Sequence, residues 1–162
     1  MADVWVESEQ SPLAIRIENV AWYGRRILET VGKGNASISV VLTDNAEIRK
    51  YNRDYLKRDK PTNVISFPMA EGEPIEGNAT YLGDVILSVE KARQEAEKFG
   101  YHVGEMVLLY LIHGILHLVG YNHEGVSEQR AREMEKQQMD ILKDLSPILK
   151  DQPILMEVDE GG

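Results

Sequence analysis

Three of the four histidines in this chain fall within one short segment, HGILHLVGYNHE, at residues 113–124. If the segment begins as a helix, His113 and His117 lie on one face, with Cβ atoms about 5 to 6 Å apart. Gly120 can adopt the left-handed backbone that ends a helix, and the resulting turn would bring His123 back towards the other two. Three imidazoles leave the fourth tetrahedral position of a zinc ion to water, as in catalytic sites. The spacing therefore predicts that one zinc ion is bound by His113, His117 and His123.

The same spacing, His-x3-His-x2-Gly-x2-His, occurs in metzincin proteases, where a glutamate follows the first histidine. Gly114 occupies that position here. The protease glutamate is the general base that activates water, and loss of such a base costs roughly 10² to 10⁴ in rate. We therefore do not expect a peptidase. The remaining histidine, His102, lies outside the array and is expected to be an ordinary hydrogen-bonded residue at a helix start.

Hydrophobic spacing and turn residues predict the elements that must position these histidines. A nearly all-apolar helix over residues 103–118, ended by Gly120, should lie buried in the middle of the domain. Around it we expect about four strands in a small mixed sheet and about five helices, an α/β (α+β) fold. The predicted strands are residues 4–6, 38–42, 63–67 (ended by Pro68) and 81–87; the other helices follow Ser11-Pro12, Asp44, Ser88 and Ser127.

The composition is that of one globular domain. The chain has 162 residues, of which 43% are hydrophobic and 28% charged, and its formal net charge is −9. We expect one metal-binding catalytic domain over residues 1–150 and a flexible acidic tail over 151–162. There is no cysteine, so a bound metal must use nitrogen or oxygen ligands. The N-terminus does not resemble a secretory signal, and the longest apolar run, Met106 to Ile112, is too short to span a bilayer, so we expect a cytoplasmic protein without membrane contact.

A basic stretch interrupts this acidic chain. RKYNRDYLKRDK, residues 49–60, holds six basic and two acidic residues. Lysine and arginine bind nucleic acid by displacing counterions from phosphates, so the stretch is a candidate RNA-binding surface. A solvated charged face is the alternative interpretation.

Two motifs, HGILHLVGYNH at residues 113–123 and PTNVISFP at residues 61–68, together resemble the YbeY family of bacterial ribosomal RNA maturation factors. HGILHLVGYNH is similar to the family signature H-G-x-L-H-L-x-G-Y-D-H, and PTNVISFP, residues 61–68, is similar to P-T-[DN]-V-[LI]-S-F-P. Gly83-Asp84 is similar to a third element, G-D-[IV], and the resemblance covers Ile38 to Leu145. Two positions depart from the family pattern: Asn122 replaces an aspartate, and Leu56 stands where an arginine often follows the tyrosine equivalent to Tyr55.

The resemblance implies a zinc-dependent, single-strand-specific endoribonuclease that acts in ribosomal RNA processing, including 16S 3′ end maturation, and in ribosome quality control. Its implied partners are single-stranded or ribosomal RNA and the ribosomal subunit or its proteins. A non-catalytic ribosome assembly factor with a structural metal is the alternative, and the missing arginine at Leu56 favours it slightly.

For such an activity, we expect the basic stretch and the PTNVISFP motif to supply the substrate-binding residues. We expect Arg58 to offset charge in the transition state and Arg53 and Lys57 to hold the RNA backbone. Thr62, Asn63 and Ser66 would add polar contacts, although Thr62 and Asn63 could instead shape the start of the strand and Ser66 could face the core. Asp84 is a candidate general base only if the fold brings it near the metal.

Overall fold

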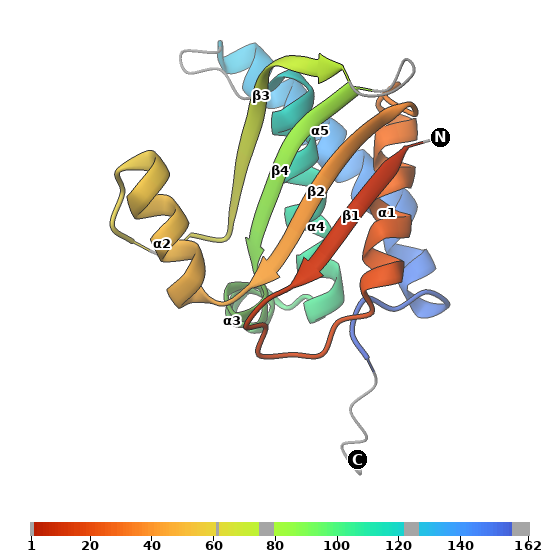
Figure 1. The fold of residues 1–162 in the computed structure, drawn as a ribbon. Helices are drawn as coiled ribbons and strands as arrows, with labels where there is room; N and C mark the ends of the chain where they lie inside the picture. Colours follow the sequence, from red (N-terminus) through yellow and green to blue (C-terminus); the bar gives the residue numbers. More distant parts are fainter. Residues whose placement is uncertain (1, 61, 75–79, 122–126, 157–162) are drawn as a thin grey trace.

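A four-stranded mixed sheet backed by helices forms the domain in the computed structural model, which describes residues 2–60, 62–74, 80–121 and 127–156 (Figure 1). The strand order is β1-β2-β4-β3, with β1, β2 and β4 parallel and β3 antiparallel to β4 at the edge. The strands are β1 (Asp3–Ser8), β2 (Ala36–Thr43), β3 (Val64–Pro74) and β4 (Thr80–Ser88). The helices are α1 (Ile17–Thr30), α2 (Asn45–Leu56), α3 (Val89–Phe99), α4 (Val103–Leu116) and α5 (Glu128–Leu145), with the short helical turns η1 (His117–Tyr121) and η2 (Ser146–Lys150). The predicted α+β fold is confirmed.

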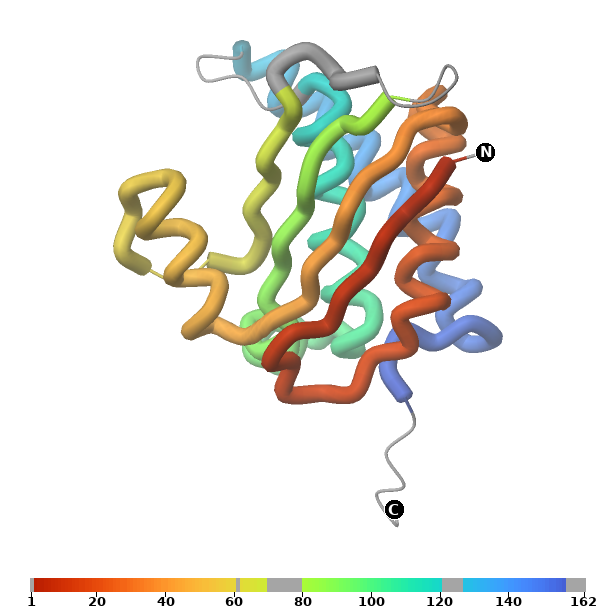
Figure 2. Tube along the Cα trace, viewed as in Figure 1, coloured from red at the N-terminus to blue at the C-terminus, as the bar shows by residue number. Residues whose placement is uncertain are grey.

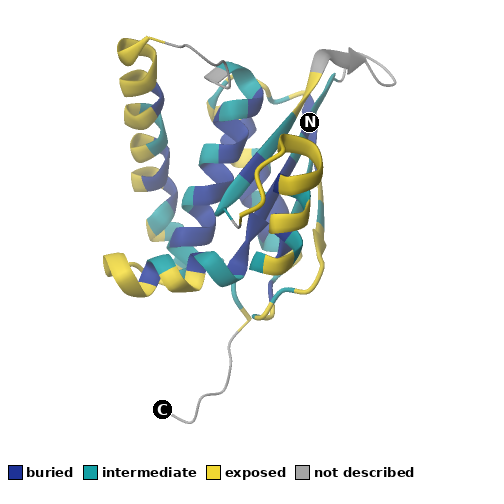
Figure 3. Ribbon diagram, turned by 90° about the vertical axis from the view of Figure 1, so that its left-hand side faces the viewer, coloured by how far each residue is buried: buried dark blue, intermediate teal, exposed yellow. Residues whose placement is uncertain are grey.

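Helix α4 is the centre of the hydrophobic core. It packs against β3 and β4 on one side and against α1, α3 and α5 on the others, so most of its residues are buried. Figure 3 shows this as a dark blue helix between the sheet and the outer helix α5, which is exposed along its outward side. Because α4 is held on all sides, the histidines at its end are held by the core as well.

Glycine allows α4 to approach the sheet closely. A Cβ atom built on Gly114 would lie 2.6 Å from Val85 Cγ1 and 3.2 Å from Val64 Cγ2. Gly83 in β4 has φ +136°, and a Cβ there would lie 2.2 Å from the Phe67 carbonyl oxygen. The backbone of β3 therefore approaches β4 closely at Gly83.

Helix α2 lies at the β3 edge of the sheet, against the face opposite α4 (Figure 1). Ile48 of α2 packs on Ile65 and Ile86 in a small second cluster. The Asp44 side chain accepts a hydrogen bond from the Glu47 amide at 2.9 Å, which confirms the predicted helix start. The helix ends at Leu56, and the residue that caps it, Lys57, adopts the left-handed conformation with φ 60°.

Two predicted boundaries are wrong. The first helix starts at Ile17 instead of after Ser11-Pro12, because Ile15 forms a bridge with Leu155 and so cannot be helical. β3 continues through Pro68 to Pro74, because it is an edge strand, where a proline that lacks an N–H is tolerated.

Residues 151–156 do not form the expected flexible tail. Ile154 is 1% exposed, and its carbonyl oxygen accepts a hydrogen bond from the Arg16 amide at 2.7 Å. The Tyr23 hydroxyl donates to the Gln152 carbonyl oxygen at 2.7 Å. Figure 2 shows this last described segment beside the residues that precede α1. The domain therefore extends at least to Met156, and residues 157–162 lie outside the described residues.

Within the described residues, Val103–Gly120 alone has the length and mean hydropathy (1.7) of a helix that could cross a membrane. Core helices of soluble proteins pass the same test, and 56% of this stretch is buried inside the protein. Its hydropathy is accounted for by the packing of α4 in the domain core.

Candidate functional site

His113 and His117 face each other at the end of α4. The two Nε2 atoms are 2.9 Å apart. Burial lowers the pKa of both imidazoles: that of His117 falls to about 4, with a smaller contribution from the neighbouring His113. Near neutral pH both side chains are therefore neutral, which is the form that binds a metal ion. The two residues lie on one face of the helix, as their spacing predicts, with the ring planes inclined at 61° to each other.

The pair fits a zinc ion. Two nitrogens bound tetrahedrally at about 2.0–2.1 Å from zinc are about 3.3 Å apart, so a small opening of the two rings would admit the ion. His123 and Asn122 lie outside the described residues, and the described part of the chain contains no group of three histidine, cysteine, aspartate or glutamate side chains that could hold a metal. The third ligand therefore stays a prediction.

A cleft of about 450 Å³ joins this histidine pair to the basic stretch. It lies between the C-terminal end of α2, the edge strand β3 and the end of α4. Its lining residues are Asn52, Leu56, Arg58, Lys60, Thr62, Val64, Ile65, Ser66, Pro68, His113 and His117. The cleft thus brings together basic, hydroxyl and imidazole groups from distant parts of the sequence.

Three of the residues predicted to contact substrate, Arg58, Thr62 and Ser66, line the cleft. The Ser66 hydroxyl donates to the Gly114 carbonyl oxygen at 2.8 Å, which ties β3 to α4. Asn63 does not line the cleft, since its amide nitrogen lies 3.3 Å from Glu95 Oε1 and its Oδ1 accepts from the Val64 amide.

The basic stretch divides into paired and unpaired cations. Arg49, Lys50 and Arg53 each form an exposed ion pair, with Asp59, Glu47 and Asp54 respectively. Among the described residues no carboxylate lies within ion-pair distance of Arg58 or Lys60, the two cations that line the cleft.

Asn52 holds the loop that carries these two cations. It is 3% exposed, its side-chain amide donates to the Lys60 carbonyl oxygen at 2.9 Å, and its own carbonyl oxygen accepts from the Arg58 amide at 3.1 Å. Nothing in the amino-acid sequence pointed to Asn52 as a residue that supports the cleft.

Asp84 does not reach the histidine pair. It is paired in register with Phe67, while Ser66, the preceding residue, points to α4. Since neighbouring strand residues point to opposite faces, Asp84 lies on the face away from the histidines. There it accepts a hydrogen bond from the Tyr81 hydroxyl, which also lies 2.8 Å from Ser39 Oγ. The condition for Asp84 as general base is not met.

Gln138 of α5 is a site residue that the sequence analysis missed. Its Oε1 lies 2.6 Å from His113 Nδ1. The sequence does contain a pattern that could have identified this residue. Gln138 stands four residues from Met134 and from Leu142, which are buried on the same stripe of α5. A glutamine within a buried stripe needs a hydrogen-bond partner, and His113 supplies it.

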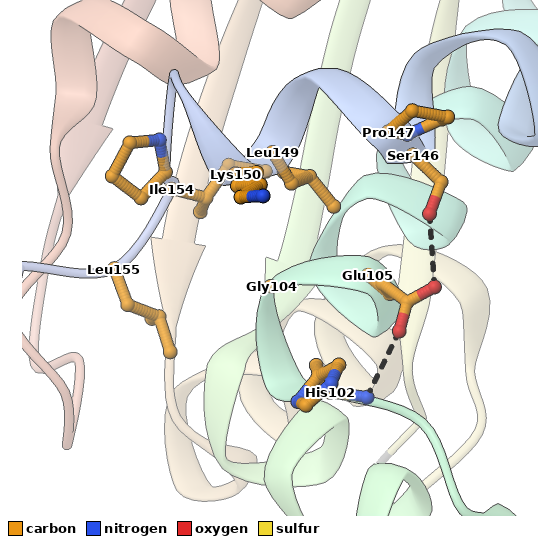
Figure 4. Close-up of a pocket in the computed structure, with 10 residues that line it drawn as sticks. His102, Gly104, Glu105, Ser146, Pro147, Leu149, Lys150, Ile154 and Leu155 are labelled. Atoms are coloured by element: carbon orange, nitrogen blue, oxygen red, sulfur yellow. Dashed lines mark hydrogen bonds between the residues drawn. The ribbon is translucent and has the colours of Figure 1, made fainter.

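A second cavity, of about 610 Å³, lies at the other end of α4 (Figure 4). Figure 4 shows Glu105 between Ser146 and His102: one carboxylate oxygen accepts from the Ser146 hydroxyl at 2.9 Å and the other from the His102 amide at 3.2 Å. Most of the remaining lining is apolar and comes from η2 and residues 153–155. His102 therefore belongs to the start of α4 and not to the histidine pair, as expected.

Comparison with known proteins identifies the family of the chain. A family model described as Endoribonuclease YbeY matches residues 6–146. Proteins with that name are similar to this chain in Syntrophotalea carbinolica (39% identity over 87% of this chain and 94% of the relative) and Geobacter metallireducens (46% identity over 78% and 82%). The solution structure of TM1509 from Thermotoga maritima shares the fold, with a TM-score of 0.64 at 24% identity over 100% of this chain and 99% of that one. The chain therefore belongs to the YbeY family of endoribonucleases.

Proposed function

We propose that this protein is a zinc-dependent endoribonuclease that cleaves single-stranded RNA during ribosomal RNA processing in the cytoplasm. The observation that carries the proposal is the cleft in which the neutral pair His113 and His117 shares a lining with the cations Arg58 and Lys60. The substrate that we propose is the 3′ end of 16S ribosomal RNA, with a further role in ribosome quality control. Ribosomal proteins or the ribosomal subunit are the proposed partners.

The residues of the cleft would have different roles in the hydrolysis of a phosphodiester. His113, His117 and His123 would hold one zinc ion, which supplies a Lewis acid for the phosphate and a bound water of lowered pKa. Arg58 and Lys60 would bind the phosphates and offset the charge that develops in the transition state. The Ser66 hydroxyl proton is directed to Gly114, so its oxygen is left to accept hydrogen bonds from a ribose or a base.

The test combines metal analysis with RNA cleavage. Purified protein should contain zinc and cleave a defined single-stranded RNA, and chelator should abolish cleavage until zinc is restored. His117→Ala should lose both properties, whereas His102→Ala, which removes a histidine at the far end of α4, should keep both. Full zinc content and full cleavage in the His117→Ala variant would refute the proposal.

One observation favours a second function, that of an assembly factor with a structural metal. Leu56 lines the cleft and is 43% exposed, so an apolar side chain stands where the resemblance leads us to expect an arginine. This alternative predicts zinc-dependent folding and RNA binding without cleavage. Leu56→Arg should then leave the protein inactive, whereas under the first proposal the same substitution should speed cleavage.

A further inference from the structure

We propose that Gln138 is a positioning residue that holds His113 in the tautomer and orientation in which Nε2 can bind the metal. The inference rests on the proposed metal site, and it assigns a role to α5, which contributes none of the predicted ligands. It follows from two contacts on opposite sides of one imidazole ring.

The two contacts fix the ring at both ends. On one side His113 Nδ1 lies 2.6 Å from Gln138 Oε1, and on the other side His113 Nε2 lies 2.9 Å from His117 Nε2. The ring therefore spans from α5 to the cleft. A rotation that breaks either contact moves Nε2 away from the point at which the two histidines converge.

The chemistry of the amide oxygen selects the tautomer. A neutral imidazole carries one N–H, and an amide oxygen can only accept a hydrogen bond. Nδ1 must therefore carry the proton, and Nε2 keeps its lone pair towards the cleft. Without an acceptor at Nδ1, the proton could reside on Nε2, where it blocks metal binding. Hydrogen bonds of this kind to ligand imidazoles are a general means of orienting them.

The packing of α5 against the core holds Gln138 in contact with His113. Met134 and Leu142, one turn before and one turn after Gln138, are 8% and 5% exposed. These two residues pack α5 against the core. The helix is therefore held both before and after Gln138, whose side-chain amide contacts His113. Arg130, earlier in α5, donates to the Gly120 carbonyl oxygen at 3.2 Å and links the same helix to the turn that follows His117.

The test measures zinc affinity in the absence of RNA, by competition between metal-free protein and a chromophoric chelator. Gln138→Met keeps the length of the side chain and removes the acceptor, and it should weaken zinc binding roughly 10- to 100-fold. Gln138→Glu keeps an acceptor and should bind zinc at least as tightly as the unmodified protein. Gln129→Met, the same change at an exposed position of α5, is the matched control and should have no effect.

A second readout separates positioning from simple loss of structure. In the metal-free protein, ¹⁵N chemical shifts of the imidazole should report a proton on Nδ1 of His113, and Gln138→Met should shift the proton towards Nε2. Unchanged zinc affinity and an unchanged tautomer in Gln138→Met would overturn the inference. Equal zinc binding by the unmodified protein and His117→Ala would instead overturn the proposed metal site.

Discussion

Gly114 of α4 lies directly against Val85 of β4, so closely that a Cβ atom at position 114 would come within 2.6 Å of Val85 Cγ1. This contact explains why glycine follows the first histidine. Position 114 points into the sheet and not towards the histidine pair, so a protease-like glutamate could not serve as a base there. The absence of a peptidase base, inferred from residue type, thus has a packing cause.

Gly114→Ala should destabilise the protein. The added methyl group overpacks the interface between α4 and β4, and we expect a loss of about 1–3 kcal/mol in the free energy of unfolding, measured by urea denaturation. Gly104→Ala is the matched control on the same helix, because a Cβ there meets no atom within 4 Å. That variant should be neutral or slightly more stable, since alanine favours helix over glycine. Equal stabilities of the two variants would contradict the close packing at Gly114.

The metal-free protein should lose stability in mild acid. The pKa of His117 in the folded protein is about 4, mainly because of burial, against an ordinary value of 6.5. Between these two pH values the unfolded chain binds more protons than the folded chain, so the free energy of unfolding falls as the pH falls from about 6.5 to about 4. The lowered pKa of His113 acts in the same direction.

Urea denaturation of chelator-treated protein across this pH range checks the prediction. His117→Gln should reduce the pH dependence, while His102→Gln should preserve it. A stability that is flat from neutral pH to about pH 4 would show that the two imidazoles are not buried as the structure has them.

The cations that line the cleft should contribute most to RNA affinity. Arg58→Glu with Lys60→Glu should weaken binding of single-stranded RNA and lower the salt slope of log affinity by about 0.7 for each phosphate that the variant no longer neutralises. Arg53→Glu with Lys57→Glu, outside the cleft lining, changes the net charge by the same amount and should have a smaller effect. Filter binding at several salt concentrations measures both quantities. The cleft assignment fails if the two double variants behave alike.

Asp84→Asn should leave zinc affinity unchanged. The side chain lies on the opposite face of the sheet from the histidines, and asparagine can still accept the hydrogen bond from Tyr81. Cleavage of single-stranded RNA should also proceed at the unmodified rate, whereas His117→Ala, measured in parallel, should be inactive. A large loss of cleavage by Asp84→Asn at unchanged zinc affinity would require a proton-transfer role that this geometry does not support.

Sequence periodicity alone determined the features that depend on neighbours along the chain. The spacing of four between His113 and His117 places both on one helix face whatever surrounds them, and the capping residues Asp44 and Ser88 set their helix starts through local hydrogen bonds. Local chemistry could not predict that α1 starts at Ile17, because the cause is the pairing of Ile15 with Leu155. That pairing exists only after the chain folds back on itself.

Tertiary structure alone decided which residues share the site. Among the residues predicted to bind substrate, Ser66 lines the cleft and Asn63 does not, because strand geometry and the partner Glu95 turn the two side chains in different directions. Gln138 reaches His113 across 25 residues because α5 packs beside α4. Spacing within a helix fixes short distances along the backbone, whereas contacts between elements depend on how the core packs, and that is a property of the whole chain.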